Sequence, residues 1–161
     1  MQAIIINGPM GVGKTTVGQY IAEKFPGTAF IDGDWCLDIH PFVGNCETKA
    51  MAVDNILHMM GNYSRCSACK MVVLVWLMDD AWVRDAIFDG VRSLGLELNA
   101  VTLMCGEDEL VHRWKNDKTC PWRTDEWLAV SKKSLSGFAR LDNCLDTTGL
   151  TVAQVAERIM G

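Results

Sequence analysis

The sequence lacks an excess of basic residues. Its formal net charge is −5, from 15 Lys and Arg against 20 Asp and Glu. A protein that binds nucleic acid non-specifically usually has a basic excess, so we expect no nucleic-acid partner. A single bound nucleotide is compatible with this charge, because a phosphate-binding loop supplies its own local positive field.

Long apolar runs are also missing. None reaches the ~20 residues that a membrane-spanning helix needs, and no signal peptide with a basic start and a small-residue cleavage site is visible. We therefore expect a cytoplasmic protein with no membrane partner. The chain lacks internal repeats, low-complexity tracts and linkers, which favours one domain over residues 1–161. We expect a monomer or a homodimer.

A second pair of closely spaced cysteines is missing too. The seven cysteines include one C-x-x-C, from Cys66 to Cys69. A structural zinc site needs four ligands, and a redox C-x-x-C normally opens a helix after a strand, whereas this pair precedes an apolar run. We expect reduced thiols and no zinc; a metal or redox role is the less favoured alternative.

What the sequence does contain is a phosphate-binding motif at residues 8–15, which fit G-x-x-x-x-G-K-[ST]. Its glycines let the backbone adopt conformations closed to other residues, so that successive N–H groups can surround phosphate oxygens. The lysine brings a cation to the β and γ phosphates, and the threonine hydroxyl can bind Mg²⁺. The predicted nucleotide-binding residues are Gly8, Gly11, Val12, Gly13, Lys14, Thr15 and Thr16.

The context of this motif supports its function. An apolar, β-branched segment at 3–6 precedes it, and a helical pattern at 15–24 follows, as a strand–loop–helix unit requires. Further strands are predicted at 28–31, 71–78, 98–105 and 143–147, and helices at 49–60, 81–94, 107–115, 124–138 and after Thr151. Alternating strands and helices predict an α/β fold with a parallel sheet between two helical layers. The alternative for the motif is a plain glycine-rich turn.

Carboxylates follow two of the predicted strands. Asp32-Gly33-Asp34 ends the second strand, and Asp79-Asp80 ends the longest apolar run, at 71–78. Open α/β sheets bind ligands beyond the carboxyl ends of their strands, where these side chains should lie. Asp79 fits the acidic residue that orients Mg²⁺ at the end of an apolar strand. The alternatives are turn capping by Asp32 and Asp34, and helix capping by Asp79 or Asp80.

Two segments interrupt the strand–helix alternation. Residues 35–69 form an expected two-helix insertion, in which Gly61-Asn62 closes the helix over 49–60, and residues 116–124 are expected to form a short lid. The tryptophans at 35, 122 and 127 could flank the substrate, because aromatic walls suit a flat ligand. Packing in the core or at a hinge is the favoured alternative, since large aromatics mostly supply buried area.

The order of these parts resembles the small P-loop kinases of the gluconate kinase, shikimate kinase and adenylylsulfate kinase type. The resemblance extends over nearly the whole chain, through "LMCGEDELVHRW" at 103–114 to "LDTTGLTVAQVAERI" at 145–159. It implies a three-layer P-loop NTPase fold with a five-stranded parallel sheet in the order 2-3-1-4-5. In these families the insertion after the second strand usually binds the acceptor, which would give residues 35–69 that task.

The resemblance also implies roles for single residues. Lys14, Asp34 and Arg123 would be catalytic: Lys14 on the phosphates, Asp34 on the acceptor hydroxyl and Arg123 as the lid arginine. Mg²⁺ would lie on Thr15 and Asp32. Further implied contacts place Arg113 against the adenine and Arg84, with Asp34 and Trp35, on the substrate.

These features together predict an ATP-dependent phosphotransferase. It would move the γ-phosphate of Mg-ATP to a hydroxyl or phosphate group of a small molecule or nucleotide. The alternatives are an ATPase that works with a partner and a non-catalytic nucleotide-binding module. A GTPase is disfavoured because the guanine motif Asn-Lys-x-Asp is missing. The lid and post-strand motifs of the three named families are also absent, so the sequence does not identify the acceptor.

Overall fold

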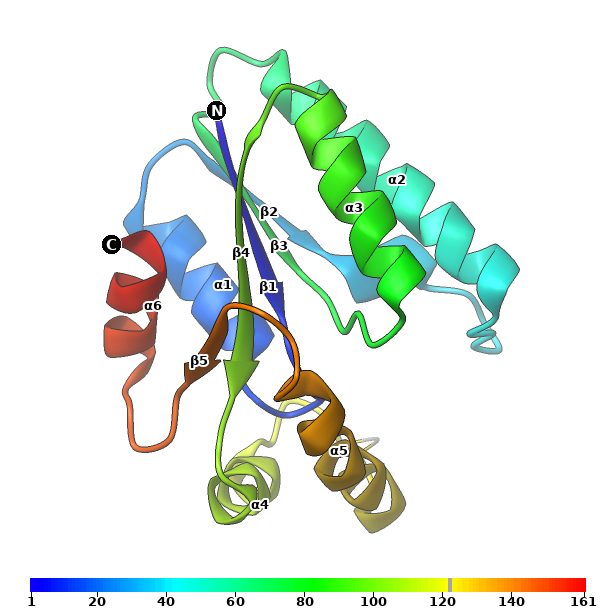
Figure 1. Ribbon diagram of the computed structural model, residues 1–161, viewed down its shortest axis with the longest axis vertical. Helices are drawn as coiled ribbons and strands as arrows, with labels where there is room; N and C mark the ends of the chain where they lie inside the picture. Colours follow the sequence, from blue (N-terminus) through cyan, green and yellow to red (C-terminus); the bar gives the residue numbers. More distant parts are fainter. Residues whose placement is uncertain (122) are drawn as a thin grey trace.

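A parallel five-stranded sheet forms the centre of the computed structural model, which describes residues 1–121 and 123–161. The strand order is β2-β3-β1-β4-β5, and every pair is parallel (Figure 1). This is the predicted order. The strands are β1 (Gln2–Asn7), β2 (Thr28–Asp32), β3 (Met71–Val75), β4 (Glu97–Met104) and β5 (Cys144–Asp146).

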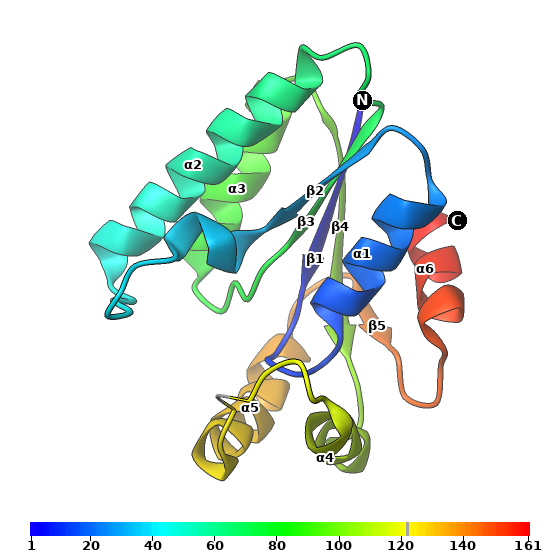
Figure 2. The ribbon, with the colours of Figure 1, turned by 180° about the vertical axis from the view of Figure 1, so that it is seen from behind.

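Helices cover both faces of the sheet. The helices α1 (Lys14–Lys24) and α6 (Val152–Met160) lie on one face, and α2 (Cys46–Ser64) and α3 (Ala81–Ser93) lie on the other (Figures 1 and 2). Alternate residues of β1 pack on opposite faces of the sheet. Ile4 and Ile6 belong to the core under α1 and α6, and Ile5 belongs to the core under α2 and α3. This is why residues 3–6 of β1 are apolar without interruption.

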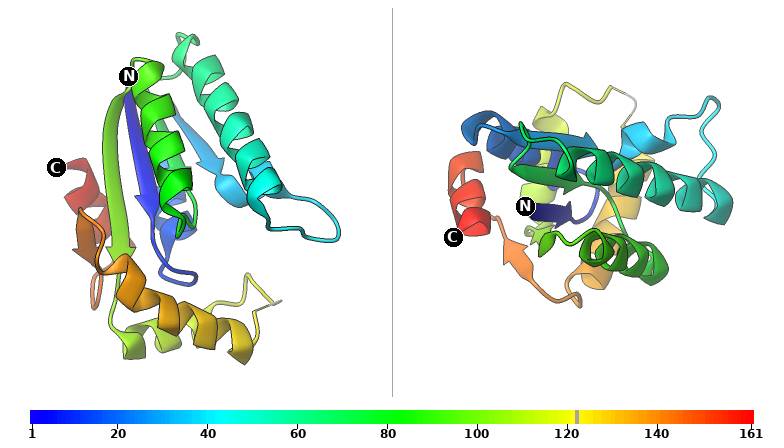
Figure 3. Two further views of the ribbon diagram at one scale, coloured as in Figure 1. Left: turned by 45° about the vertical axis from the view of Figure 1, so that its right-hand side comes forward. Right: turned by 90° about the horizontal axis from the view of Figure 1, so that it is seen from above.

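Two further helices lie beyond the carboxyl ends of the strands. The helices α4 (Glu107–Asn116) and α5 (Asp125–Phe138) close this end of the molecule, and the short 3₁₀ helix η1 (Gly33–Leu37) borders it at the edge of the sheet (Figure 3). The loop between β1 and α1 lies among them. The fold therefore brings the predicted site segments to one end of the sheet.

The structure corrects two predicted boundaries. The apolar run at 71–78 is a strand only as far as Val75, and Trp76 and Met78 are buried without pairing as a strand. The Asn7 side chain substitutes for the sheet there: its Oδ1 accepts from the Met78 amide at 2.9 Å, and its Nδ2 donates to the Met78 carbonyl at 3.3 Å. The buried N–H and C=O groups of Met78, beyond the end of the strand, are thus both hydrogen-bonded.

The predicted helix over 49–60 is longer than expected at both ends. A capping box between Asn45 and Thr48 starts α2 at Cys46, and the helix continues through Gly61 and Asn62 to Ser64. The prediction that Gly61 and Asn62 close it was wrong, because Gly61 is buried, and packing keeps such a glycine helical despite its low propensity. The other predicted insertion helix is the single short turn of η1.

Across residues 1–121 and 123–161, no helix is both long enough and apolar enough to cross a membrane.

Candidate active site

The loop between β1 and α1 has the geometry that the glycine motif predicts. Gly8, Gly11 and Gly13 all have positive φ, at 140°, 80° and 104°. A Cβ on Gly8 would lie 2.5 Å from the Leu103 carbonyl oxygen, so only glycine fits against the end of β4. Space around Gly13 is open, since a Cβ there would have no heavy atom of the described residues within 4 Å. The loop is therefore tightly packed at Gly8 and open at Gly13.

Lys14 begins α1 and folds back over this loop. Its Nζ donates to the carbonyl oxygens of Gly8 and Pro9, both at 2.9 Å. Burial of the ammonium group lowers the pKa of Lys14 to about 8, although the nearby carboxylates of Asp34 and Asp32 oppose this change. Among the described residues its hydrogen-bond partners are carbonyl oxygens, and a desolvated cation of this kind interacts strongly with an anion.

Thr15 and the end of β2 meet beside Lys14. The Thr15 hydroxyl donates to Asp32 Oδ2 at 3.2 Å, and the Asp34 amide donates to Asp32 Oδ1 at 3.1 Å. Asp32 is buried, and this burial raises the pKa of its carboxyl group. Asp34, two residues further along the turn, is exposed. The structure thus brings together the predicted metal-binding pair Thr15 and Asp32, with Asp34 next to them.

Arg123, in the predicted lid segment 116–124, lies near enough to Lys14 for its charge to act on that residue. Arg123 Nη1 lies 2.5 Å from Asp117 Oδ2, and its guanidinium group lies 5.1 Å from the centre of the Trp114 ring. The positive charge of Arg123 helps to lower the Lys14 pKa, which places the two cations near each other. Hydrogen bonds from Thr119 lower the pKa of Asp117, so that residue stays an anion that orients Arg123.

The helix after the lid is attached to the phosphate loop itself. The Ser131 hydroxyl, buried on α5, donates to the Met10 carbonyl at 2.6 Å. On α4, the Trp114 ring would lie 2.7 Å from a Cβ at Gly11. The predicted lid segment is therefore bracketed by two helices that both contact the loop.

Arg113 has a positioning role that sequence reasoning missed. Its Nη1 donates to the Val12 carbonyl at 2.8 Å and to Thr147 Oγ1 at 2.9 Å, and its Nη2 donates to the Thr147 carbonyl at 2.7 Å. Its Nε donates to Glu109 at 2.8 Å. The N–H groups along the edge of the guanidinium group thus link the loop to the end of β5. The predicted contact of Arg113 with the adenine of ATP stays a prediction.

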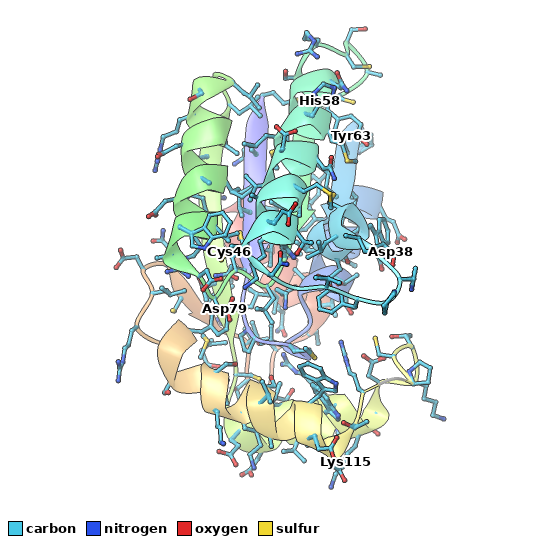
Figure 4. The ribbon with its side chains drawn as sticks, turned by 90° about the vertical axis from the view of Figure 1, so that its right-hand side faces the viewer. Asp38, Cys46, His58, Tyr63, Asp79 and Lys115 are labelled. Atoms are coloured by element: carbon cyan, nitrogen blue, oxygen red, sulfur yellow. The ribbon has the colours of Figure 1, made fainter. Side chains whose placement is uncertain are left out.

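Arg84 and Asp79 are held on the α2–α3 side of the site. Arg84 Nη1 donates to the carbonyl oxygens of Met78 and Asp79, both at 2.8 Å. Lys49 Nζ, on α2, lies 2.7 Å from Asp80 and 3.9 Å from Asp79. Figure 4 shows Asp79 near Cys46, where α2 begins. The Asp79 side chain is 60% exposed and its contact with Lys49 is the longer of the two, so its predicted metal role stays a prediction; Asp80 occupies the N-cap position of α3.

Two of the three tryptophans proposed to flank the substrate are described, and both are exposed. The exposed fraction is 66% for Trp35 and 46% for Trp127. Packing in the core, one part of the favoured alternative, was therefore wrong for these two, and packing at a hinge stays a prediction. Trp35 follows Asp34 in η1, and Trp127 lies one turn before Ser131 on the loop-facing helix α5. Trp122 lies outside the described residues.

Comparison with known proteins agrees with this geometry. Residues 4–128 match the family described as AAA domain. The tunicamycin resistance protein of Deinococcus radiodurans is 24% identical, with a TM-score of 0.74 over 98% of this chain and 92% of that one. A gluconokinase from Sinorhizobium meliloti 1021 is 19% identical, with a TM-score of 0.73 over 98% and 89%. These likenesses establish the predicted fold.

A third similarity is local. Over 38 residues, which make up 24% of this chain, the sequence is 40% identical to the shikimate kinase of Psychrobacter cryohalolentis. The match spans 20% of that curated relative. The AAA domain match, in contrast, covers well over half of the chain, including the phosphate loop, the residues at the end of β2 and the lid arginine. The chain belongs to the AAA domain family, within the P-loop fold that its glycine motif predicts.

Proposed function

We propose that this protein is an ATP-dependent phosphotransferase, which moves the γ-phosphate of Mg-ATP to a hydroxyl or phosphate group of a small molecule or nucleotide. One observation supports this most directly: beside Lys14 the Thr15 hydroxyl donates to Asp32 at 3.2 Å, and Asp34 and Arg123 lie near enough for their charges to act on Lys14. The loop, the end of β2 and the segment that carries Arg123 would then serve one site. The similarities to a gluconokinase and a shikimate kinase support the same reaction.

Charge explains how these groups would act. Phosphoryl transfer spreads negative charge over three equatorial oxygens, so catalysis depends mainly on positioning and on cations. Lys14, at the start of α1, would lie on one side of the transferring group, and Arg123, oriented by Asp117, would approach it from the predicted lid. The amides of the loop supply further donors. Asp34 would accept the proton of the acceptor hydroxyl or orient it.

The residues beside Lys14 suit Mg²⁺. Thr15 and Asp32 present a hydroxyl and a carboxylate oxygen 3.2 Å apart, and hard oxygen donors are the ligands that Mg²⁺ prefers. Burial raises the pKa of the Asp32 carboxyl group, and a bound cation would offset this effect. Thr15 and Asp32 would hold the ion, which would neutralise charge on the β and γ phosphates.

The test is ADP release with and without a panel of phosphorylatable metabolites. Release that depends on an acceptor supports a phosphotransferase, slow release without an acceptor indicates an ATPase, and binding without turnover indicates a nucleotide-binding module. Lys14→Ala should abolish transfer, because it removes the cation on the transferring phosphate. Lys24→Ala, at the other end of α1, is the control. Normal turnover by Lys14→Ala would refute the assignment.

A second substitution separates proton transfer from nucleotide binding. Asp34→Asn should lower turnover about 10²- to 10⁴-fold, the usual contribution of a general base, and should leave ATP affinity nearly unchanged. The control is Asp38→Asn, an exposed aspartate just after η1. If ATP binding is lost together with turnover in Asp34→Asn, Asp34 belongs to the metal site instead.

A further inference from the structure

Trp114 is buried near the end of α4, in contact with the phosphate loop. It is 7% exposed, and it lies two residues before Asn116, the last residue of the helix. A Cβ on Gly11 would lie 2.7 Å from Trp114 Cε3 and 3.2 Å from Cζ3, so the benzene edge of the indole packs against the backbone of the loop. The loop therefore fixes where this ring lies.

The same ring lies against Arg123. The Cζ atom of the Arg123 guanidinium group is over the ring, 5.1 Å from its centre, which is within the ~6 Å reach of a cation–π interaction. The Arg123 side chain is 16% exposed, and the attraction between a cation and a ring is stronger where water is excluded. Trp114 thus contacts the phosphate loop through its edge and the predicted lid arginine through its face.

Packing in a hydrophobic core does not explain this position. In the described part of the chain, Trp114 is buried but belongs to neither core. Leu110, one turn earlier in α4, does belong to the core under α1 and α6. A buried tryptophan usually contributes its large area to a core, whereas this ring contacts a loop glycine and the predicted lid arginine. Its place points to a role in holding these two segments.

An aromatic face is a suitable support for an arginine that must bind phosphate. The guanidinium group carries five N–H donors in one plane, and Asp117 Oδ2 accepts from Nη1 at 2.5 Å, which fixes one edge of that plane. A ring against the face fixes the plane itself, uses no N–H donor and does not neutralise the charge. The charge of Arg123 acts on Lys14, so the guanidinium group lies near the predicted phosphate site.

We propose that Trp114 is a positioning residue: its ring, anchored on Gly11, holds the Arg123 guanidinium group in the orientation that binds the γ-phosphate. The inference rests on the proposed function and adds to its site a residue that does not touch the substrate. Asp117 holds the edge of the guanidinium group, and Trp114 holds its face. Loss of the ring should leave Arg123 charged but poorly oriented, so the contact with the γ-phosphate should weaken while the loop still binds the nucleotide.

The test measures how strongly the protein prefers a nucleotide that has a γ-phosphate. Calorimetry with Mg²⁺ present gives the dissociation constants of ADP and of the non-hydrolysable ATP analogue AMP-PNP, and their ratio reports the γ-phosphate contact without an acceptor. Trp114→Leu keeps an apolar side chain against Gly11 and should lower this preference about tenfold, or ~1.4 kcal/mol, within the range of a desolvated cation–π pair. Trp114→Phe keeps an aromatic face and should stay within about threefold of wild type. Trp82→Leu, at an exposed tryptophan of α3, is the matched control and should not change the ratio.

A double-mutant cycle separates positioning from a structural effect on the loop. Arg123→Ala should lower the preference for AMP-PNP at least as much as Trp114→Leu does. If Trp114 acts through Arg123, Trp114→Leu changes nothing further in the Arg123→Ala background. A fall by the same factor in both backgrounds would show a structural effect and overturn the inference. A wild-type preference in Arg123→Ala would also overturn it, because Arg123 would then not contact the γ-phosphate.

A fluorinated ring gives a second measurement that does not depend on the folding of Trp114→Leu. Tetrafluorotryptophan at position 114 keeps nearly the same shape and weakens the negative ring face, so it should lower the preference for AMP-PNP and leave ADP affinity unchanged. A wild-type preference with this ring overturns the inference and leaves the phosphotransferase intact. The expected cycle in a protein that releases no ADP with any acceptor keeps the positioning role and overturns the phosphotransferase.

Discussion

Replacing Lys14 by methionine should make the fold more stable at neutral pH. Enclosure of the ammonium group lowers the Lys14 pKa from the ordinary 10.5 to about 8. At ~1.36 kcal/mol for each pKa unit, the charged form destabilises the folded state by up to about 3.4 kcal/mol at pH 7. Methionine has a similar length and no charge, so it removes this cost.

Part of that gain is offset by lost hydrogen bonds. Lys14 Nζ donates to the Gly8 and Pro9 carbonyl oxygens, both at 2.9 Å. Hydrogen bonds to a charged group contribute ~1.5–3 kcal/mol when their partners are left buried, but the open side of the loop lets water replace the ammonium group. We expect a net stabilisation of Lys14→Met of about 1–2 kcal/mol, together with loss of phosphate binding. A functional residue that destabilises its own fold fits the usual trade-off at active sites.

The pH dependence gives the sharper measurement. Below pH 8 both the folded and the unfolded chain hold the Lys14 proton, and the full cost applies. Between pH 8 and 10.5 the folded chain binds fewer protons than the unfolded chain, so the wild-type free energy of unfolding gains from this group as pH rises. By pH 9.5 this gain is about 2 kcal/mol. Lys14→Met lacks this titrating group, so the difference in unfolding free energy between Lys14→Met and wild type should become smaller as pH rises.

Urea unfolding at pH 7 and pH 9.5 without nucleotide measures both quantities. Burial also raises the pKa of Cys36 and Cys105, which changes the pH dependence of stability in the same range, but this effect is common to both proteins and cancels in their difference. Lys24→Met, on the exposed last turn of α1, is the control and should track wild type. The reasoning is refuted if Lys14→Met and wild type differ by the same amount at both pH values.

Two further substitutions test how the loop is positioned. Gly11→Ala should cost more than ~2 kcal/mol in unfolding free energy and abolish ATP binding, because φ is 80° and the new Cβ would lie 2.7 Å from the buried Trp114 ring. Arg113→Ala should cost about 3 kcal/mol and weaken ATP binding, because it leaves the Val12 and Thr147 carbonyls without their charged donor. Chemical unfolding and calorimetric ATP titration measure both. Each substitution has a control in the chain. Gly137→Ala, in α5, has open space around the new Cβ and a helical backbone, so it should stabilise the fold by ~0.5–1 kcal/mol. Arg92→Ala removes an exposed arginine paired with Asp89 and should stay within ~0.5 kcal/mol of wild type. Wild-type ATP affinity in Arg113→Ala would show that the loop keeps its shape without this tie.

The end of β2 shows what sequence patterns could predict. Asp32 and Asp34 were placed by a general rule, that carboxyl ends of parallel strands form the site, and the structure brings them to Thr15. Glycine spacing likewise predicts the positive φ values of the loop, because the requirement is local. Local geometry and strand polarity are properties of short segments, which explains why the sequence alone was enough for these residues.

The partners of the arginines and of Asp79 depend on tertiary contacts instead. Nothing in the spacing of Arg113 indicates that it would reach across to the carbonyls of Val12 and Thr147, which are far away in the sequence. Asp79 follows an apolar strand as a metal-orienting acid should, yet Lys49 on the longer-than-predicted α2 lies beside it. The extension of α2 depended on packing around Gly61, which no local propensity signals.

Stability and phosphate affinity at Lys14 have a common physical origin. Before phosphate arrives, burial of the ammonium group outweighs the attraction of Asp34 and Asp32, and Arg123 adds a smaller repulsion, so the folded protein disfavours its charge. A phosphate removes that mismatch, because it brings negative charge into the same low-dielectric space where Coulomb interactions are strongest. The free energy that destabilises the empty loop is therefore recovered on binding. Above pH 8, where Lys14 is mostly neutral, phosphate must also draw a proton onto it, which weakens binding as pH rises.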